Sequence, residues 1–267
     1  MIAIYANKEK DNNYAVSEKI LKLLKAKNTD GVIFKKPEEI KAPADVLAVI
    51  GGDGTILSVI PQAVKYNLPV VGINFGGLGF LTEFEDREVS EAVDFICGGD
   101  KIKEEKTLLN LSFKNKNYLA LNEVTLSRIY NEETSAQVAY IEAKTDGLLI
   151  DRYIADGLIV STPTGSTAYS LSAGGSVLSP SIKAFSLIPI CAHSLRSRPV
   201  IFPDDKEITL NLFQGDTDAG LFVDGRCVAK VKNFEEAKIS KSEKTITFLR
   251  RPGYNFYGRL HRKMNKW

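Results

Sequence analysis

Three glycines enclose a single carboxylate in the stretch Gly51-Gly52-Asp53-Gly54-Thr55. Glycine has no Cβ, so it adopts unusual backbone angles and lets a bulky anion approach backbone N–H donors closely. A helix that begins at Thr55 would direct its N-terminus at the same anion. The stretch therefore predicts a phosphate site. A carboxylate repels phosphate unless it has a task, so we expect Asp53 to accept a proton from an attacking hydroxyl or to hold a metal ion through water.

A plainer alternative is a tight strand-to-helix turn in which Asp53 only caps the helix. The two commonest phosphate motifs do not fit this stretch. It lacks the Gly-x-x-x-x-Gly-Lys-Ser/Thr of a Walker loop and the Gly-x-Gly-x-x-Gly of the dinucleotide fingerprint. The glycines thus indicate phosphate binding on a different type of fold.

The apolar run Val46–Ile50 positions this motif, because it predicts a strand buried on both faces of a parallel sheet. Ligands of such sheets bind just beyond the carboxyl ends of the strands. Strands and helices alternate along residues 1 to about 100, as parallel βαβ units require. The other expected strands are Ile2–Ala6, Gly31–Phe34 and Pro69–Asn74, and the expected helices are Tyr14–Leu24, Thr55–Tyr66 and Glu88–Cys97. The fold class predicted for this part is an open α/β, Rossmann-like domain.

A second glycine-rich segment, Gly72–Thr82, leaves the strand that ends at Asn74. If the two strands are neighbours, this segment lies beside the Gly51–Gly54 loop. The alternative is a mobile surface loop. Two glycine-rich exits from adjacent strands favour a second wall of the same phosphate site.

After Gly98-Gly99 the pattern changes to short apolar, aromatic and Thr-rich runs separated by turn residues, which predicts a mostly β, β-sandwich-like domain over residues 103–249. The Asp146-Gly147 and Asp224-Gly225 pairs indicate hairpins. The expected strands are Leu108–Phe113, Tyr118–Leu121, Val124–Ser127, Ala136–Ala143, Leu148–Ile150, Leu158–Val160, Ile208–Phe213, Gly220–Val223, Ala237–Ile239 and Thr245–Leu249.

A run of hydroxyls and small residues, Ser161–Ser172, follows Asp156 and a buried strand in this β region. A packed core has no need of so many hydroxyls, whereas a ligand with hydroxyls, ring nitrogens and phosphates does. Tyr169 offers a ring on which a base could stack. We expect a ligand wall here, against the alternative of a polar surface loop. Asn122-Glu123 is a weaker signal, which by itself favours a turn or bulge over hydrogen bonds to a ribose.

The whole chain limits the function classes. Its 267 residues carry 35 basic and 33 acidic side chains, so no overall field draws it to nucleic acid. No stretch approaches the ~18 apolar residues of a membrane span. Three separated cysteines without a metal-binding pattern indicate reduced thiols in the cytoplasm and argue against structural zinc. A C-terminal basic cluster is expected to be a solvated helix face, and its members are Arg250, Arg251, Arg259, Arg262, Lys263 and Lys266.

Together these motifs resemble the NAD kinase family over nearly the whole chain and in the right order. The run Thr162–Tyr169 is the most specific of them, whereas other kinases share the first motif. In chain order the matching motifs are Gly51-Gly52-Asp53-Gly54-Thr55, Gly72-x-Asn74-x-Gly76-x-Leu78-Gly79-Phe80-Leu81-Thr82, Asn122-Glu123, Asp156-Gly157 with Thr162–Tyr169, Pro189–Pro199, Val223-Asp224-Gly225 and Phe256–Trp267.

The resemblance implies transfer of the γ-phosphoryl group of ATP, or of polyphosphate, to the 2′-hydroxyl of the adenosine ribose of NAD, which gives NADP. Asp53 would be the base, and a divalent ion such as Mg²⁺ would accompany the phosphates on Gly51, Gly52, Gly54 and Thr55. The residues implied to bind the dinucleotide are Asn122, Glu123, Asp156, Thr167, Ala168, Tyr169, Ser170 and Ser172.

The family fold is an α/β domain, residues 1–102 with a tail 250–267 that returns to it, followed by the β domain, and NAD lies between them. Family members form homodimers or homotetramers. Diacylglycerol, sphingosine and 6-phosphofructo-kinases carry a similar glycine-rich Asp motif and are the first alternative. A non-catalytic dinucleotide-binding regulator on the same fold is the second.

Overall fold

The computed structural model describes residues 1–8, 11, 13–41, 43–77, 79–129, 138–214 and 218–265. Its contacts divide the chain into two compact units, which are described separately: Met1–Lys106 with Lys244–Trp267, and Thr107–Glu243. The first residues of the expected strand Ala136–Ala143 lie outside the described residues, as do Leu78 of the second glycine-rich segment and Lys266 of the basic cluster.

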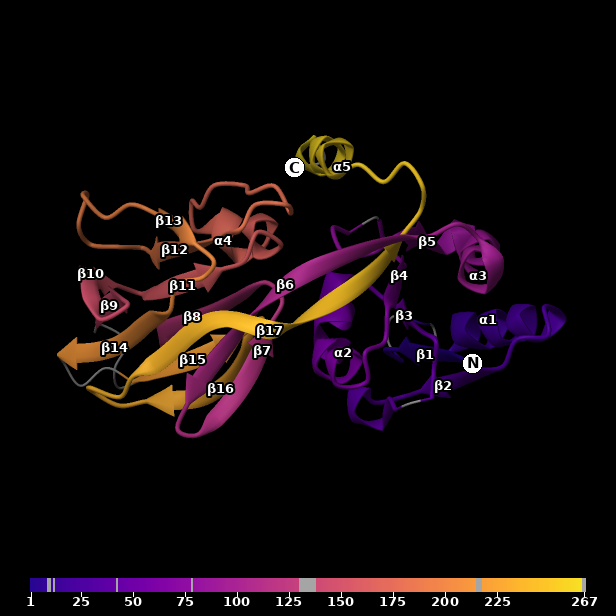
Figure 1. The fold of residues 1–267 in the computed structure, drawn as a ribbon, viewed down its shortest axis with the longest axis horizontal. Helices are drawn as coiled ribbons and strands as arrows, with labels where there is room; N and C mark the ends of the chain where they lie inside the picture. The colour runs from indigo at the N-terminus through magenta and orange to yellow at the C-terminus, as the bar shows by residue number, and fades with distance from the viewer. Residues whose placement is uncertain are drawn as a thin grey trace. The chain divides into compact units, whose positions relative to one another are not determined.

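The first unit is built on a parallel sheet in the order β4-β3-β1-β2, as expected for βαβ units (Figure 1). All five residues of β3 are buried, so this strand is covered on both faces. Its apolar side chains share one core with those of the helices α1 and α3. The bounds of the sheet strands are β1 Ile2–Ala6, β2 Gly31–Phe34, β3 Val46–Ile50, β4 Val70–Asn74 and β5 Phe84–Glu85. The helices are α1 Ala15–Ala26, η1 Pro37–Glu39, α2 Asp53–Lys65, η2 Asp86–Glu88, α3 Val89–Gly98 and α5 Phe256–Met264.

The C-terminal residues belong to this first unit, as the resemblance implied. Phe248 of β17 (Ala237–Arg250) pairs in parallel with Val70 of β4, and helix α5 follows. β17 replaces the two short strands expected over 237–239 and 245–249, and it contains residues of both units, as β6 (Ile102–Phe113) also does.

The second unit is mostly β, with two antiparallel arrays whose inward side chains share one apolar core, as in a sandwich. One array contains β10-β9-β14-β17 and the hairpin β6-β7, and the other has the order β13-β12-β11-β8-β15-β16. The further bounds are β7 Lys116–Ala120, β8 Glu123–Arg128, β9 Ala139–Thr145, β10 Leu148–Ala155, β11 Gly157–Ser161, η3 Gly165–Thr167, α4 Tyr169–Ser172, β12 Ala184–Ile190, β13 Val200–Pro203, β14 Ile208–Gln214, β15 Ala219–Val223 and β16 Arg226–Val231. The predicted fold class is confirmed.

Both predicted hairpins form. Asp146 and Gly147 have φ of 48° and 79°, and Asp224 and Gly225 have φ of 46° and 78°. These left-handed angles are the ones that two-residue hairpin turns require. Lys114-Asn115, with φ of 48° and 60°, makes the same kind of turn without a glycine, and the sequence pattern did not reveal it.

Strand β12 is absent from the expected strands, and it contains Pro189, a residue that argues against a strand inside a sheet. β12 pairs with β11 from Ser186 to Ile190, whereas β13 pairs with it from Ala184 to Leu187. Pro189 therefore lies beyond the part of β12 that has β13 as a neighbour. The missing N–H of the proline breaks no bond to β13 at that position.

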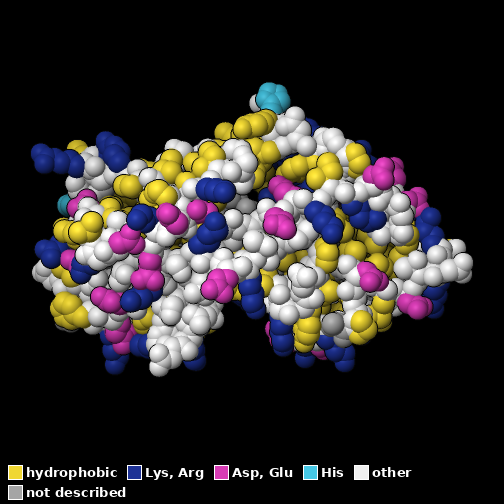
Figure 2. Space-filling view, viewed as in Figure 1, with side chains coloured by type: hydrophobic (Ala, Val, Ile, Leu, Met, Phe, Trp, Pro, Cys, Tyr) yellow, Lys and Arg dark blue, Asp and Glu magenta, His cyan; other side chains and the backbone are white. Residues whose placement is uncertain are grey.

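Charged side chains of both signs are interspersed on the face of the molecule that Figure 2 shows. Within the described residues, no helix has both the length and the apolar character that are needed to cross a membrane.

Candidate active site

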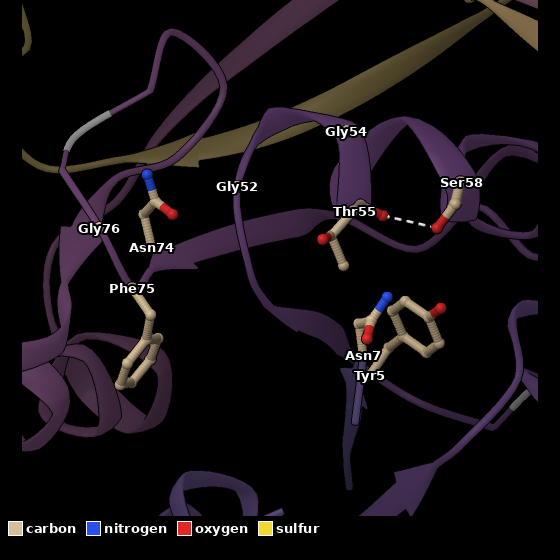
Figure 3. Close-up of a pocket in the computed structure, with 9 residues that line it drawn as sticks. All are labelled: Tyr5, Asn7, Gly52, Gly54, Thr55, Ser58, Asn74, Phe75 and Gly76. Atoms are coloured by element: carbon tan, nitrogen blue, oxygen red, sulfur yellow. Dashed lines mark hydrogen bonds between the residues drawn. The ribbon is translucent and has the colours of Figure 1, made fainter. Parts of the chain in front are cut away.

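The first glycine motif forms one wall of a cavity of about 610 Å³ in the first unit (Figure 3). β3 ends at Ile50, and α2 begins at Asp53 with Gly52 as its N-cap, two residues earlier than expected. Gly51 makes this turn at a φ of 143°, and a Cβ there would lie 2.4 Å from Thr55 Oγ1. The residues that line the cavity are Tyr5, Asn7, Gly52, Gly54, Thr55, Ser58, Asn74, Phe75 and Gly76.

The structure brings the two glycine-rich segments together around this cavity. β3 and β4 are hydrogen-bonded parallel neighbours, and Gly52 follows β3 while Asn74 is the last residue of β4. Of the predicted phosphate-binding residues, Gly52, Gly54 and Thr55 line the cavity, whereas Gly51 and Asp53 are not among its lining residues.

Tyr5, Asn7 and Ser58 also line the cavity, and the sequence analysis did not select them. The sequence did contain a signal that could have identified Tyr5 and Asn7. They lie at the end of β1, which pairs in parallel with β3, so the rule on carboxyl ends of strands applies to them as well. Ser58 lies on α2, where its hydroxyl donates to the carbonyl oxygen of Thr55 (2.7 Å).

The Asp53 side chain is held by the second glycine-rich segment. Its two carboxylate oxygens accept from the backbone N–H groups of Phe80 (2.8 Å) and Leu81 (3.1 Å). The N-cap of α2 is Gly52, which has no side chain, and the Asp53 carboxylate is bonded to Phe80 and Leu81, so Asp53 is more than a helix cap. Gly79 is packed against this carboxylate, because a Cβ at Gly79 would lie 2.0 Å from Asp53 Oδ1.

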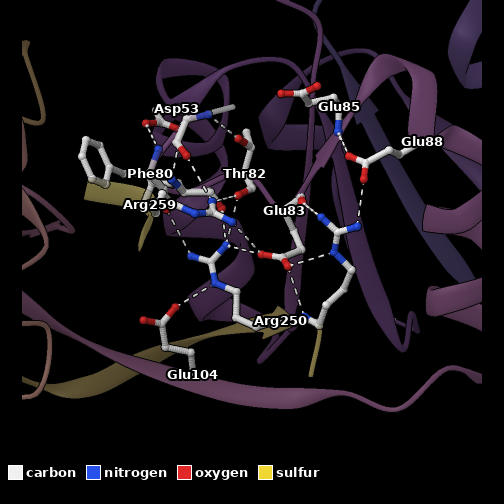
Figure 4. Close-up of polar contacts among 12 residues, drawn as sticks. Asp53, Phe80, Thr82, Glu83, Glu85, Glu88, Glu104, Arg250 and Arg259 are labelled. Atoms are coloured by element: carbon white, nitrogen blue, oxygen red, sulfur yellow. Dashed lines mark hydrogen bonds and ion pairs between the residues drawn. The ribbon is translucent and has the colours of Figure 1, made fainter. Parts of the chain in front are cut away.

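The expectation of a solvated basic face at the C-terminus is wrong for two of its arginines. Arg250 is 0% exposed and Arg259 is 4% exposed, and both pair with the buried carboxylate of Glu83 (Figure 4). Arg262 is exposed, as expected. Charge runs are usually solvated, but a run on a chain end that packs against its own domain need not be.

In the second unit, Asp224 organises the turn that contains Asn122-Glu123. Its carboxylate accepts from the N–H groups of Leu121 (2.9 Å), Asn122 (2.8 Å) and Glu123 (3.2 Å). Asp224 therefore has a second task besides its hairpin. Asn122 and Glu123 are themselves 7% and 6% exposed.

Glu123 is a buried carboxyl group next to a second carboxylate. Burial, with a smaller contribution from the negative charge of Asp224, raises the pKa of Glu123 to about 8. Burial also raises the pKa of Asp224. Glu123 Oε2 has no hydrogen-bond partner among the described residues. A protonated Glu123 could donate a hydrogen bond to a ligand at neutral pH.

This pKa predicts a pH-dependent stability. The folded chain binds the Glu123 proton more tightly than the unfolded chain, where the ordinary value is 4.5. Its contribution to the free energy of unfolding is therefore complete below about pH 4.5 and is lost as the pH rises towards about 8. We expect Glu123→Gln, which does not titrate, to gain stability relative to the wild type across this window, by up to about 1.4 kcal/mol per pH unit.

Urea midpoints of both proteins at several pH values from about 5 to 8 test this expectation. Glu243→Gln, at an exposed position of the same unit, is the matched control and should remain parallel to the wild type. A Glu123→Gln curve that also remained parallel would contradict the expected titration.

Part of the hydroxyl run Ser161–Ser172 binds the protein itself. Thr162, fully buried, donates to the carbonyl oxygen of Leu121 (2.6 Å) and accepts from the N–H of Gly165 (3.0 Å). The hydroxyl of Ser166 likewise donates to the carbonyl oxygen of Pro163 and accepts from the N–H of Leu178. The argument that a packed interior has no need of these hydroxyls is wrong here, because they satisfy backbone groups in a segment with little regular structure.

The residues proposed for nucleotide binding lie at the end of this run. Tyr169 is 45% exposed, Thr167 and Ala168 are half-buried, and Ser172 is exposed. Ser170 is 0% exposed, and its hydroxyl has no partner among the described residues. Asp156 pairs with Arg128 at 3.0 Å. These residues belong to the same unit as Asn122 and Glu123. The two segments are joined by a backbone bond, in which the N–H of Thr162 donates to the carbonyl oxygen of Asn122.

Comparison with known proteins decides the family. The family model described as "ATP-NAD kinase N-terminal domain" matches residues 8–101, and "ATP-NAD kinase C-terminal domain" matches residues 121–251. An NAD kinase of Caldicellulosiruptor saccharolyticus is 34% identical over 267 residues and is covered completely, as is this chain. The chain belongs to the NAD kinase family.

Three further relatives are similar to this chain in sequence or in structure. An NAD kinase of Burkholderia thailandensis is 36% identical over 234 residues, which cover 86% of this chain and 77% of the relative. An NAD kinase of Archaeoglobus fulgidus, solved in complex with ATP, has a TM-score of 0.78 at 27% identity, and 94% of each chain is covered. A yeast NADH kinase solved with NADH shares the fold, with a TM-score of 0.77 at 24% identity over 97% of this chain and 86% of the other.

Family membership confirms the predicted fold and the predicted phosphotransferase activity of an NAD kinase. None of the comparisons supports the lipid kinases, the sugar kinases or the non-catalytic regulator.

Proposed function

We propose that this NAD kinase family member transfers the γ-phosphoryl group of ATP, or of another nucleotide or polyphosphate, to the 2′-hydroxyl of the adenosine ribose of NAD, with Asp53 as the base. One observation carries the proposal. A single carboxylate, oriented by two backbone N–H groups, follows a buried strand beside a glycine-lined cavity. Phosphoryl transfer needs positioning and charge neutralisation more than covalent chemistry by the protein.

The cavity is the proposed site of the donor phosphates. Gly52 and Gly54 place backbone N–H groups at the start of α2, and Gly51 shapes the turn that presents them. Asn74, Asn7, Thr55 and Ser58 add amide and hydroxyl groups. Phosphates that bind here would need a further source of positive charge, because the lining residues that the structure describes include neither lysine nor arginine.

A divalent ion that arrives with the phosphates, such as Mg²⁺, fits this donor set. Amide and hydroxyl oxygens are hard ligands, and Mg²⁺ in phosphoryl-transfer enzymes takes most of its ligands from phosphate and water. Among the described residues, no group of three His, Cys, Asp or Glu side chains could hold a metal ion. The ion, when bound, would neutralise the phosphate charge.

The proposed NAD site in the second unit consists of Asn122, Glu123, Asp156, Thr167, Ala168, Tyr169, Ser170 and Ser172. The half-exposed ring of Tyr169 supports stacking against a base. Two buried polar atoms without partners among the described residues, Ser170 Oγ and Glu123 Oε2, support hydrogen bonding to a ligand. A homodimer or homotetramer in the cytoplasm completes the proposal, and the three exposed free cysteines suit a reducing compartment.

The test is NADP formation from NAD with ATP and Mg²⁺, coupled to an NADP-specific dehydrogenase. We expect turnover that disappears when a chelator removes the metal and that falls sharply in Asp53→Asn. Polyphosphate replaces ATP in a parallel assay. Absence of NADP with both donors, while calorimetry still shows NAD binding, would contradict the proposed reaction.

A further inference from the structure

Each backbone N–H group that binds Asp53 belongs to a peptide unit whose carbonyl oxygen accepts from a buried arginine. The first is the unit between Gly79 and Phe80. Its N–H donates to Asp53 Oδ2 at 2.8 Å, and its carbonyl oxygen accepts from Arg259 Nη1 at 3.1 Å. A single peptide group therefore links the guanidinium of Arg259 to the carboxylate of Asp53.

Arg250 makes the same link through the next peptide unit (Figure 4). The N–H of Leu81 donates to Asp53 Oδ1 at 3.1 Å, and the carbonyl oxygen of Phe80 accepts from Arg250 Nη2 at 3.3 Å. Arg250 Nη1 also donates to the carbonyl oxygens of Leu81 (3.0 Å) and Thr82 (3.3 Å). Hydrogen bonds in such chains polarise one another, so the arginines strengthen the donors that Asp53 uses.

The segment 79–82 depends on these bonds for its conformation. It is neither helix nor strand, and Arg259 also donates to the carbonyl oxygen of Thr82. The carbonyl oxygens of all four residues thus accept from the two arginines. The remaining local bond runs from the N–H of Gly79 to Thr82 Oγ1 (2.8 Å).

The two guanidinium groups lie close together because their charges are balanced. The buried carboxylate of Glu83 pairs with Arg250 at 3.2 Å and with Arg259 at 3.1 Å. Glu104 pairs with Arg250 Nε at 2.8 Å. Both guanidinium groups also lie over the ring of Tyr254, 4.7 and 5.0 Å from its centroid.

Helix α5 presents Arg259 to this segment. The Asn255 side chain caps the helix by accepting from the N–H groups of Tyr257 and Gly258. The ring of Phe256, at the first position of α5, lies 6.4 Å from the ring of Phe80. The C-terminal tail is therefore fixed against the segment that holds Asp53.

We propose that Arg250 and Arg259 are positioning residues of phosphoryl transfer: each fixes and polarises, through one peptide unit, a hydrogen-bond donor of Asp53. The inference rests on the proposed role of Asp53 as the base. A tail that served only to stabilise the domain would change the free energy of unfolding and would leave turnover by the folded enzyme intact.

Arg259→Met tests the proposal in the full-length chain. The variant keeps Glu83 paired, since Arg250 and Arg251 remain at 3.2 and 3.3 Å from its oxygens. We expect kcat to fall about 10- to 100-fold, because small displacements of a reacting group are costly, with KM for NAD and ATP changed less than about 3-fold. Arg259→Lys, which retains the charge and some donors, should have an intermediate kcat. Arg262→Met, at an exposed position of the same helix, should match the wild type.

A double-mutant cycle with Asp53→Asn decides whether Arg259 acts through Asp53. Residues that act as a unit are strongly non-additive, so Arg259→Met should cost little further turnover in the Asp53→Asn background. An equal loss in both backgrounds, or a folded Arg259→Met enzyme with wild-type kcat, would overturn the inference. If Arg259→Met does not fold, Arg259→Lys is judged by the same cycle. Near-normal turnover of Asp53→Asn alone would instead refute the proposed base, and the inference with it.

Discussion

Asp53→Asn is expected to lower kcat by about 10²–10⁴-fold, the usual loss when a general base is removed. The amide cannot accept the proton of the 2′-hydroxyl, while its size and shape are those of the carboxylate. KM for NAD and ATP should change much less, because the cavity and the proposed nucleotide-binding residues do not depend on the charge of Asp53. Steady-state kinetics with the coupled NADP assay measures both quantities.

The structure adds an expectation about the stability of this variant. Each carboxylate oxygen of Asp53 accepts one N–H, from Phe80 and from Leu81, whereas an asparagine side chain has only one acceptor oxygen. One N–H would then face the NH₂ group of the substituted side chain, at a cost of about 1–3 kcal/mol. Urea denaturation therefore has to accompany the kinetics. A folded variant with near-normal turnover would show that Asp53 only holds the segment 79–82.

Gly79→Ala is the second change with a large expected effect. A Cβ at this position would lie 2.0, 2.6 and 2.8 Å from Oδ1, Cγ and Oδ2 of Asp53. Contacts that short are impossible, so the carboxylate has to move away from its two backbone donors. A displacement of about 1 Å at a reacting group can cost on the order of 10²-fold in rate, and we expect a loss of kcat of that size.

The effect of Gly79→Ala should lie in kcat rather than in folding. The added methyl group meets the end of a side chain, the Asp53 carboxylate, rather than backbone. Gly98→Ala is the matched control, since a Cβ there meets nothing within 4 Å. Kinetics and thermal unfolding of the three proteins test the expectation. Wild-type kcat in Gly79→Ala would mean that the Asp53 carboxylate can shift without harm to catalysis.

Much of the fold follows from local patterns. The run Val46–Ile50 and the alternation of strands with helices predict a parallel sheet, and two glycine-rich exits predict a site at its carboxyl edge. The Asp-Gly pairs predict hairpins, because few residues tolerate left-handed backbone angles. In each case the physical cause acts between residues that are close in the sequence or obey a periodicity.

The sequence pattern was a poor guide where a side chain finds its partner far along the chain. Ser166 and Thr162 looked like ligand-binding hydroxyls, but they bind backbone groups that only the folded loop brings near. Asp224 looked like a hairpin residue, and it also holds a turn about a hundred residues earlier in the chain. Spacing carries no information about such pairs.

The sequence by itself determined the family, and it predicted the phosphate motif and the single carboxylate that we propose as the base. Only the tertiary structure decided how that carboxylate is held. Arg259 pairs with Glu83 across 176 positions, and both side chains are buried. A charged residue is expected in water unless a specific partner offsets the cost of burial, and that partner becomes visible only when the chain has folded.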